Sequence, residues 1–373
     1  MNKNKIWLSS PHMGGAEQKY VNEAFDTNWV APLGLNVNGF EQDLKQYLIK
    51  NVQVAALSSG TAALHLALKL ACVEKNDYVL CQSNSHIASA NPIIYQGAIP
   101  VFVDSEPDTW NISPELLETA ILDLQDKGIQ PKAVVVAHLY GMPAKMDEIN
   151  TIATKYGLKV IEDAAEALGS TYKGSACGTL GDYGILSFNG NKIITTSGGG
   201  ALVTKSEADK QKAIFWATQA RDVAPHYQHS EIGYNYRMSN IVAGIGRGQM
   251  QVLDLRVQQR RNNFAFYKEA LKDLPIAVVA DEGQDFFSNR WLSTILTHSF
   301  DKREQIRLTL ADENIEARPL WKPMHLQPVF KDAPAYVNGV SEDLFARGLC
   351  LPSGSNLTDA DRARILDALL AVF

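Results

Sequence analysis

A regular alternation of short apolar runs with helical stretches, between residues 52 and 205, constrains the fold of this chain more than any other feature. The runs are rich in β-branched residues, and the stretches between them carry apolar residues three or four positions apart, as on one helix face. The expected strands are Gln53–Leu57, Tyr78–Cys81, Pro100–Asp104, Ala133–His138, Lys159–Asp163, Gly184–Phe188 and Ala201–Thr204. Such alternation predicts a mainly parallel sheet wrapped by helices, with ligands outside the carboxyl ends of the strands.

The texture of the sequence changes after Tyr236. One long helical pattern, dense in Arg and Gln, runs from about Ser239 to Lys272, and a smaller α+β region follows it. The elements expected in that region are a strand at Trp291–Leu296, a helix at Lys302–Asn314 and a final helix at Asp359–Val372 that Thr358 caps. We therefore predict two domains, a large one at residues 1–250 and a small C-terminal one at residues 251–373.

Charge and cysteine content exclude several classes of protein. Lys and Arg number 35 against 41 Asp and Glu, a net charge of −6, and no basic tract is present, which argues against nucleic acid or an anionic membrane as partner. The four cysteines are far apart and form no CxxC pair, so neither a disulfide scaffold nor a metal site is expected. No stretch approaches the roughly 18 apolar residues of a membrane helix, and we expect a cytoplasmic protein.

The segment Ser58-Ser59-Gly60-Thr61 lies between a predicted strand and an Ala-rich helix. Gly60 lets backbone N–H groups approach a ligand, Thr61 offers a hydroxyl, and the helix start adds partial positive charge, which together make an anion site. The alternative is an ordinary capped strand-to-helix turn. The ATPase loop pattern GxxxxGK[ST] is absent.

Two further segments place ionisable side chains where ligands bind. Asp163 ends an apolar strand, where its carboxylate can pair with a protonated ring nitrogen, and Glu166 follows three positions later. Lys192 lies on a polar loop after the next strand, followed by the small residues 195–200, and is a candidate for forming a Schiff base. A helix-capping Asp and a surface lysine are the ordinary alternatives.

A fourth segment, GYNYRMSN at residues 233–240, opens the long helical pattern. Asn235 and Arg237 in this segment are candidates to bind phosphate. The alternative is a loop that ends in a helix cap.

The segments SGTAALHLAL, IEDAAEALGS, SFNGNKIITTSGGG and GYNYRMSN occur in the order typical of one enzyme family. The chain closely resembles the nucleotide-sugar aminotransferases of the DegT/StrS family, from PHMGG near its start to RPLWKPMH and LCLPSG near its end. The resemblance implies an α/β structure of pyridoxal-phosphate (PLP) fold type I, like aspartate aminotransferase. Its large domain would hold a mainly parallel seven-stranded sheet, and its C-terminal domain would be a smaller α+β unit.

The resemblance also implies roles for individual residues. Lys192 would hold the cofactor covalently and move a proton, and Asp163 would pair with the pyridine nitrogen. Glu166, where many relatives have Gln, would reach the phenolic side of the ring. The phosphate would be bound by Gly60, Thr61, Ser187 and, from the neighbouring subunit of an obligatory homodimer, Asn235. His86 stands where relatives commonly have an aromatic residue that stacks on the ring.

The nearest branch of the family aminates UDP-4-keto-6-deoxy-N-acetylglucosamine during bacillosamine synthesis, with glutamate as the usual donor. The expected nucleotide-sugar pocket comprises Asn28, Trp29, Val30, Ala31, Trp321, Lys322, Pro323 and Met324, with Arg237 and His325 as further candidates. Three alternatives stay open: a sugar 3-dehydratase, which tends to have His in place of Lys192, an NAD-dependent oxidoreductase, which needs GxGxxG, and a catalytically silent relative.

Overall fold

The computed structural model describes residues 4–48, 51–278 and 283–373. Its main sheet contains all seven strands predicted from the sequence, with ends that shift by one residue at most, and a short eighth strand at the edge. In spatial order the strands are β1 (Gln53–Leu57), β9 (Gly200–Thr204), β8 (Tyr183–Ser187), β5 (Lys159–Asp163), β4 (Ala133–Ala137), β2 (Tyr78–Gln82), β3 (Ile99–Val103) and β14 (Ala335–Tyr336). Only β9 runs antiparallel to its neighbours, so the predicted mainly parallel sheet is confirmed.

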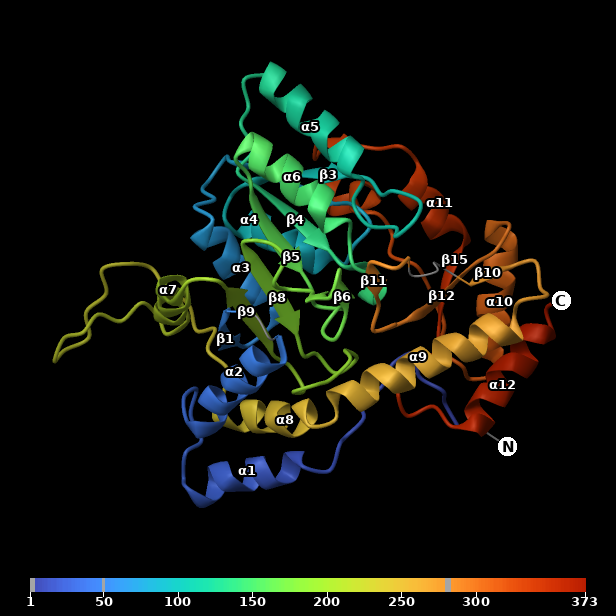
Figure 1. Cartoon of the computed structure of the whole chain (residues 1–373), viewed down its shortest axis with the longest axis horizontal. Helices are drawn as coiled ribbons and strands as arrows, with labels where there is room; N and C mark the ends of the chain where they lie inside the picture. Colours follow the sequence, from blue (N-terminus) through green and yellow to red (C-terminus); the bar gives the residue numbers. More distant parts are fainter. Residues whose placement is uncertain (1–3, 49–50, 279–282) are drawn as a thin grey trace.

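Helices cover both faces of this sheet (Figure 1). Alternate strand residues point to opposite faces: Val135 packs with α3 (Gly60–Leu70) and α7 (Glu207–Ala217), whereas Val134 and Val136 pack with α5 (Pro114–Asp126) and α6 (Met146–Tyr156). A third buried cluster joins α2 (Leu35–Leu48) to α8 (Asn240–Met250). The strands are therefore apolar on both faces, as their β-branched runs indicate.

The single long helix predicted for residues 239–272 is wrong. Two helices, α8 and α9 (Leu253–Ala270), meet at Gln251 and Val252, whose N–H groups bond three residues back. The Val252 side chain packs so closely on Gly14 that a Cβ there would lie 2.9 Å from it. Contact with the N-terminal segment therefore fixes the break, and no helix-breaking residue marks it.

The C-terminal region forms a second, four-stranded sheet in the order β10 (Ala277–Val278), β12 (Ser293–Leu296), β15 (Gly348–Leu351) and β13 (Arg318–Pro319). Three helices accompany it: α10 (Phe300–Asp312), α11 (Val340–Arg347) and α12 (Asp359–Leu370). Thr358 caps α12 in a capping box, as predicted. Contacts cross residue 250 in both directions, since Ile6 bridges Ile315 and β14 joins the main sheet. The division into two domains stays a prediction.

Three smaller groups of elements complete the chain. A three-stranded sheet contains β11 (Phe286–Phe287), β6 (Thr171–Tyr172) and β7 (Ser175–Ala176). Two further helices are α1 (Glu17–Asp26) and α4 (Asn91–Tyr95), and short 3-10 turns lie at Ile87–Ser89, Leu139–Gly141, Met324–Leu326 and Pro328–Phe330. Between α7 and α8 the chain reaches away from the body as a long arm, residues 218–235 (Figure 1). Across the described residues, no helix combines the length and apolar character that a bilayer span requires.

Candidate active site

A cavity of about 270 Å³ opens at the carboxyl ends of the parallel strands. Its walls come from the start of α3, the end of β5, the loop after β8 and two loops of the C-terminal region. Eight residues singled out in the sequence line it: Gly60, Thr61, His86, Asp163, Glu166, Ser187, Lys192 and Trp321. The structure thus gathers into one place residues up to 261 positions apart (321 − 60).

One end of the cavity is formed by the first turn of α3. Ser59 caps this helix, since its Oγ accepts the N–H of Ala62, while N–H groups at the start of any helix have no partner inside it. Backbones meet closely here: a Cβ on Gly60 would lie 3.1 Å from Cβ of Ser187, and one on Gly200 would lie 2.3 Å from N of Gly60. Only glycine fits at Gly200, a side chain at Gly60 would press on Ser187, and the resulting turn suits an anion such as phosphate.

Asp163 ends β5 with its carboxylate held from two sides. Ser89 Oγ donates to Oδ2 at 2.6 Å, and the N–H of Ala165 donates to Oδ1 at 3.2 Å. Neither donor carries a positive charge, so the carboxylate can still pair with a cationic group in the cavity.

Lys192 points into the cavity between a carboxylate and an aromatic face. Its Nζ lies 3.6 Å from Oε1 of Glu166 and 4.2 Å from the centre of the Trp291 ring. Trp291 also holds the backbone of the lysine loop, because its Nε1 donates to the carbonyl of Asn191 at 2.7 Å. Burial raises the pKa of the Glu166 carboxyl, although Lys192 and the N–H of Tyr140 oppose this shift.

His86 caps the short 3-10 turn at Ile87–Ser89, where Nδ1 accepts the N–H of Ala88, and its ring also lines the cavity. The ring meets Trp321 edge to face, with centroids 5.2 Å apart. Burial, and then the charge of Lys192, lowers the pKa of the imidazole, while Asp163 opposes the shift. His86 therefore caps the turn and lines the cavity at the same time.

The remaining predicted residues lie outside this cavity. Asn235 is exposed at the base of the arm, bridged to Thr218. The guanidinium of Arg237 is paired with Glu41 and with the carbonyl of Ala56. Of the Asn28–Ala31 segment, Trp29 lines a separate cavity of about 620 Å³ beside Asn240 and Arg247. In the other segment, Lys322, Pro323, Met324 and His325 follow Trp321 but do not line the cavity. Met324 is buried in the core, and His325 bonds Ser83 and Glu342.

Sequence reasoning singled out Trp321 but missed Tyr140 and Trp291, which form an aromatic cluster with it. Tyr140 is nearly parallel to Trp291 on one side and to Trp321 on the other, with centroids 6.4 and 6.1 Å apart. The backbone of Tyr140 is left-handed, with φ of 54°, which is strained for a bulky residue. Trp291 is predicted as the first residue of a strand, which in the structure begins at Ser293, and nothing in its sequence neighbourhood points to a site.

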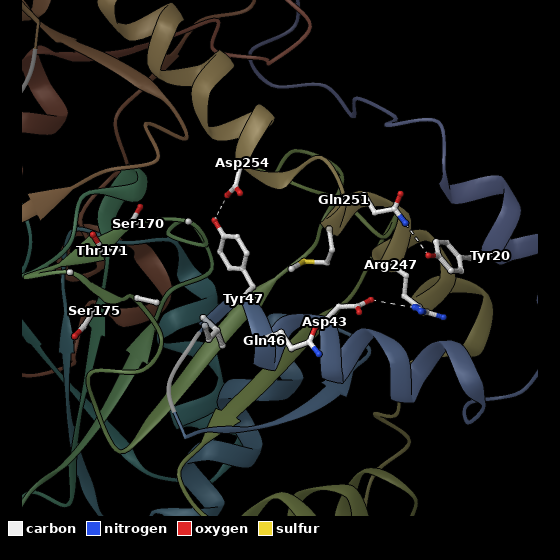
Figure 2. A pocket seen from close by; sticks show the side chains of 15 residues that line it. Tyr20, Asp43, Gln46, Tyr47, Ser170, Thr171, Ser175, Arg247, Gln251 and Asp254 are labelled. Carbon is white, nitrogen blue, oxygen red and sulfur yellow. Dashed lines mark hydrogen bonds and ion pairs between the residues drawn. The ribbon is translucent and has the colours of Figure 1, made fainter.

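A larger cavity, of about 840 Å³, lies between α1, α2, α8 and residues 169–176 (Figure 2). Its polar side chains bond one another, as Tyr47 does with Asp254 and Gln251 with Tyr20. None of the candidate site residues lines it. Size alone therefore does not identify the active site.

The smaller cavity fits the chemistry of pyridoxal phosphate. It has an anion-binding turn at one end, a carboxylate in its wall and a lysine beside them. The buried Nε1 of Trp321 has no partner among the described residues, as expected where a ligand binds. With this sheet order, these features define a PLP-dependent enzyme of fold type I.

Comparison with known proteins gives the family. The model of the DegT/DnrJ/EryC1/StrS aminotransferase family matches residues 11–370. Over 373 residues the chain is 54% identical to "Putative pyridoxal phosphate-dependent aminotransferase EpsN" of Bacillus subtilis (strain 168), covering 99% of this chain and 96% of the relative. It is 38% identical to GDP-perosamine synthase of Escherichia coli O157:H7, with 98% and 97% covered. A crystal structure of a DegT DnrJ EryC1 StrS aminotransferase from Brucella abortus superposes with a TM-score of 0.88 at 28% identity, covering 95% of each chain. The chain belongs to this family and is a PLP-dependent sugar aminotransferase.

Proposed function

We propose that this enzyme transfers the amino group of glutamate to the 4-keto carbon of a UDP-linked 4-keto-6-deoxy-N-acetylhexosamine. The product would be a UDP-4-amino sugar such as the precursor of bacillosamine, used in bacterial glycan or glycoprotein synthesis. The observation that carries an amine transfer is the convergence of Lys192, Asp163 and the α3 turn on one cavity. The nucleotide and sugar come from the sequence resemblance, and the reaction fits a protein of the reducing cytoplasm, with four free cysteines.

Each residue of the cavity has a separate role in this reaction. When bound, pyridoxal phosphate supplies a protonated ring that draws electrons from the carbon losing its proton. Asp163 keeps the ring nitrogen protonated through a charge-assisted hydrogen bond. The first turn of α3, with Thr61 and Ser187, binds the phosphate. The Lys192 amine binds the cofactor and moves the proton at the reacting carbon.

The functional unit in this proposal is a homodimer whose subunits complete each other's sites. Among the residues that line the cavity, Lys192 is the one lysine or arginine, although phosphate, glutamate and the nucleotide are all anionic. The arm exposes the apolar side chains of Val223, Tyr227 and Ile232, which a second copy would cover. Asn235, at the base of this arm, would then reach the cofactor phosphate of the partner.

A GDP-linked keto sugar is the second candidate substrate. Three relatives that are 38%, 36% and 32% identical to the chain are named GDP-perosamine synthase, and perosamine is an amino sugar. In this alternative the same residues would perform the amine transfer, and only the nucleotide and sugar contacts would differ.

A panel of substrates separates these possibilities. Purified enzyme with glutamate is incubated with UDP- and GDP-linked 4-keto-6-deoxy sugars and with 3-keto isomers, and each product is identified by mass spectrometry. We expect a UDP-4-amino sugar and 2-oxoglutarate in equal amounts. Amination of the GDP sugar alone would establish the second candidate, and loss of water without amination would establish a dehydratase.

A further inference from the structure

The carboxylate of Glu166 is held between the Lys192 amine and the backbone of Tyr140. Its Oε2 accepts the N–H of Tyr140 at 2.7 Å, and its Oε1 lies 3.6 Å from Nζ of Lys192. The pair is nearly buried, with 13% of the Lys192 side chain and 10% of the Glu166 side chain exposed. The backbone thus fixes one carboxylate oxygen and turns the other toward the amine.

We propose that Glu166 is a catalytic base that takes a proton from the Lys192 ammonium and frees the amine for attack on the aldehyde of pyridoxal phosphate. The N–H bond of the ammonium breaks, and its electron pair stays on nitrogen. An O–H bond forms on Oε1, so the ion pair becomes a neutral amine and a neutral carboxylic acid. The proposal rests on the proposed function, since Lys192 must be the lysine that binds the cofactor.

Burial favours this transfer, because it replaces two charges in a water-poor site by two neutral groups. Burial also raises the pKa of the Glu166 carboxyl, and the charge of Asp163 raises it further, against Lys192 and the N–H of Tyr140. A carboxyl with a raised pKa accepts the proton more readily than an exposed one.

Three titratable groups around Glu166, namely Tyr140, Cys350 and His86, are neutral at pH 7. Burial raises the pKa of the Tyr140 phenol well above its usual value and that of the Cys350 thiol to about 12. Burial lowers the pKa of the His86 imidazole, which lines the same cavity. His138 also lines it; burial acts to lower its pKa, but Cys177 and Glu162 outweigh burial and raise it to about 10. His138 is paired with Glu162, and the charges that act on Glu166 are those of Lys192 and Asp163.

The test follows the covalent capture of Lys192 in protein freed of cofactor. Pyridoxal phosphate is added to the native protein and to Glu166→Gln, and the rate of attachment is read from visible absorbance between about pH 6 and about pH 10. Gln keeps the shape and the acceptor for Tyr140 but is not a base at these pH values. We expect attachment to Glu166→Gln to be about a hundredfold slower at neutral pH. The difference should shrink as pH approaches about 10.4, where a lysine loses its proton to water.

Two controls separate a base from a structural residue. Pyridoxamine phosphate, which cannot attach covalently, should bind Glu166→Gln as tightly as native protein. Glu166→Asp, which keeps a carboxylate farther from the amine, should attach at an intermediate rate and also serves if Glu166→Gln does not fold.

Three outcomes would overturn the inference. A native attachment rate in Glu166→Gln at neutral pH removes the need for a base. A loss that is equal at all pH values, with weaker pyridoxamine phosphate binding, means a structural role. Both of these leave the proposed function intact, whereas attachment at a lysine other than Lys192 overturns the inference and the proposed function together.

Discussion

Ser89 Oγ lies 2.6 Å from Oδ2 of Asp163 and donates a hydrogen bond to it. Ser89 in turn meets Ser85 Oγ at 2.7 Å, and Ser85 lines the cavity wall beside His86. The carboxylate that ends β5 is therefore oriented by a serine from the loop that also carries the candidate ring-stacking residue.

Replacing Ser89 by Ala should weaken this orientation without removing the charge of Asp163. We expect turnover to fall about tenfold or more, since a hydrogen bond to a charged group contributes about 1.5–3 kcal/mol. Steady-state kinetics measure the effect. Ser85→Ala is the matched control, because it leaves the donor to Asp163 in place. A loss in Ser85→Ala as large as that in Ser89→Ala would contradict the account.

Replacing Asp163 by Asn keeps the shape of the side chain and removes its charge. The protein should still bind the cofactor, but turnover should fall about a hundredfold, because a neutral amide does not hold a ring nitrogen in its protonated form. Absorbance spectra report bound cofactor, and single-turnover kinetics report the chemistry. Near-native turnover would show that Asp163 does not have this role.

Asn235 tests whether sites are shared between subunits. Lys192→Ala subunits should be inactive and Asn235→Ala subunits weakened, yet mixing them should restore activity, because one site of each hybrid then holds both native residues. Activity is measured on heterodimers purified by two different tags. Heterodimers without recovered activity would place Asn235 in the site of its own subunit or outside any site.

His86 is expected to lie flat against the cofactor ring as a neutral imidazole. The lowered pKa of His86, caused by burial and then by Lys192, agrees with a neutral ring at pH 7. Aromatic stacking contributes about 0.5–1.5 kcal/mol beyond burial, so His86→Ala should release pyridoxamine phosphate several times more readily. His86→Phe should retain it at least as well as native protein. Equal retention by His86→Ala and native protein would refute stacking.

Much of the fold could be predicted from local patterns. The strands of the main sheet are apolar on both faces, so each is recognisable in the sequence as a β-branched run. Thr358 marks the start of the last helix, because a threonine at this position is a typical N-cap. The break between α8 and α9 could not be predicted, because Gln251 and Val252 are compatible with a helix. Packing of Val252 on Gly14, a residue far away in the sequence, decides it.

Only part of the candidate site could be predicted, because some of its residues are placed by local elements and others by contacts between distant parts of the chain. Gly60, Asp163 and Lys192 sit at ends of predicted elements, where strand topology brings them to one edge of the sheet. Trp291 lines the cavity only through the packing of the C-terminal region on the main sheet, and Tyr140 stacks on the Trp291 and Trp321 rings. No local pattern carries that information. Arg237, by contrast, was a candidate to bind phosphate, but in the structure its guanidinium forms an ion pair with buried Glu41.

The central claim is that Lys192 is the residue that binds the cofactor, and one measurement tests it most directly. Holoenzyme is reduced with borohydride and digested, and the labelled peptide is identified by mass spectrometry. A Lys322→Ala variant, which lacks a lysine close to Trp321 but outside the cavity, is the control. The account predicts a yellow protein with a single labelled peptide containing Lys192, in native enzyme and control alike. A label on any other lysine, or none in native enzyme, would contradict it.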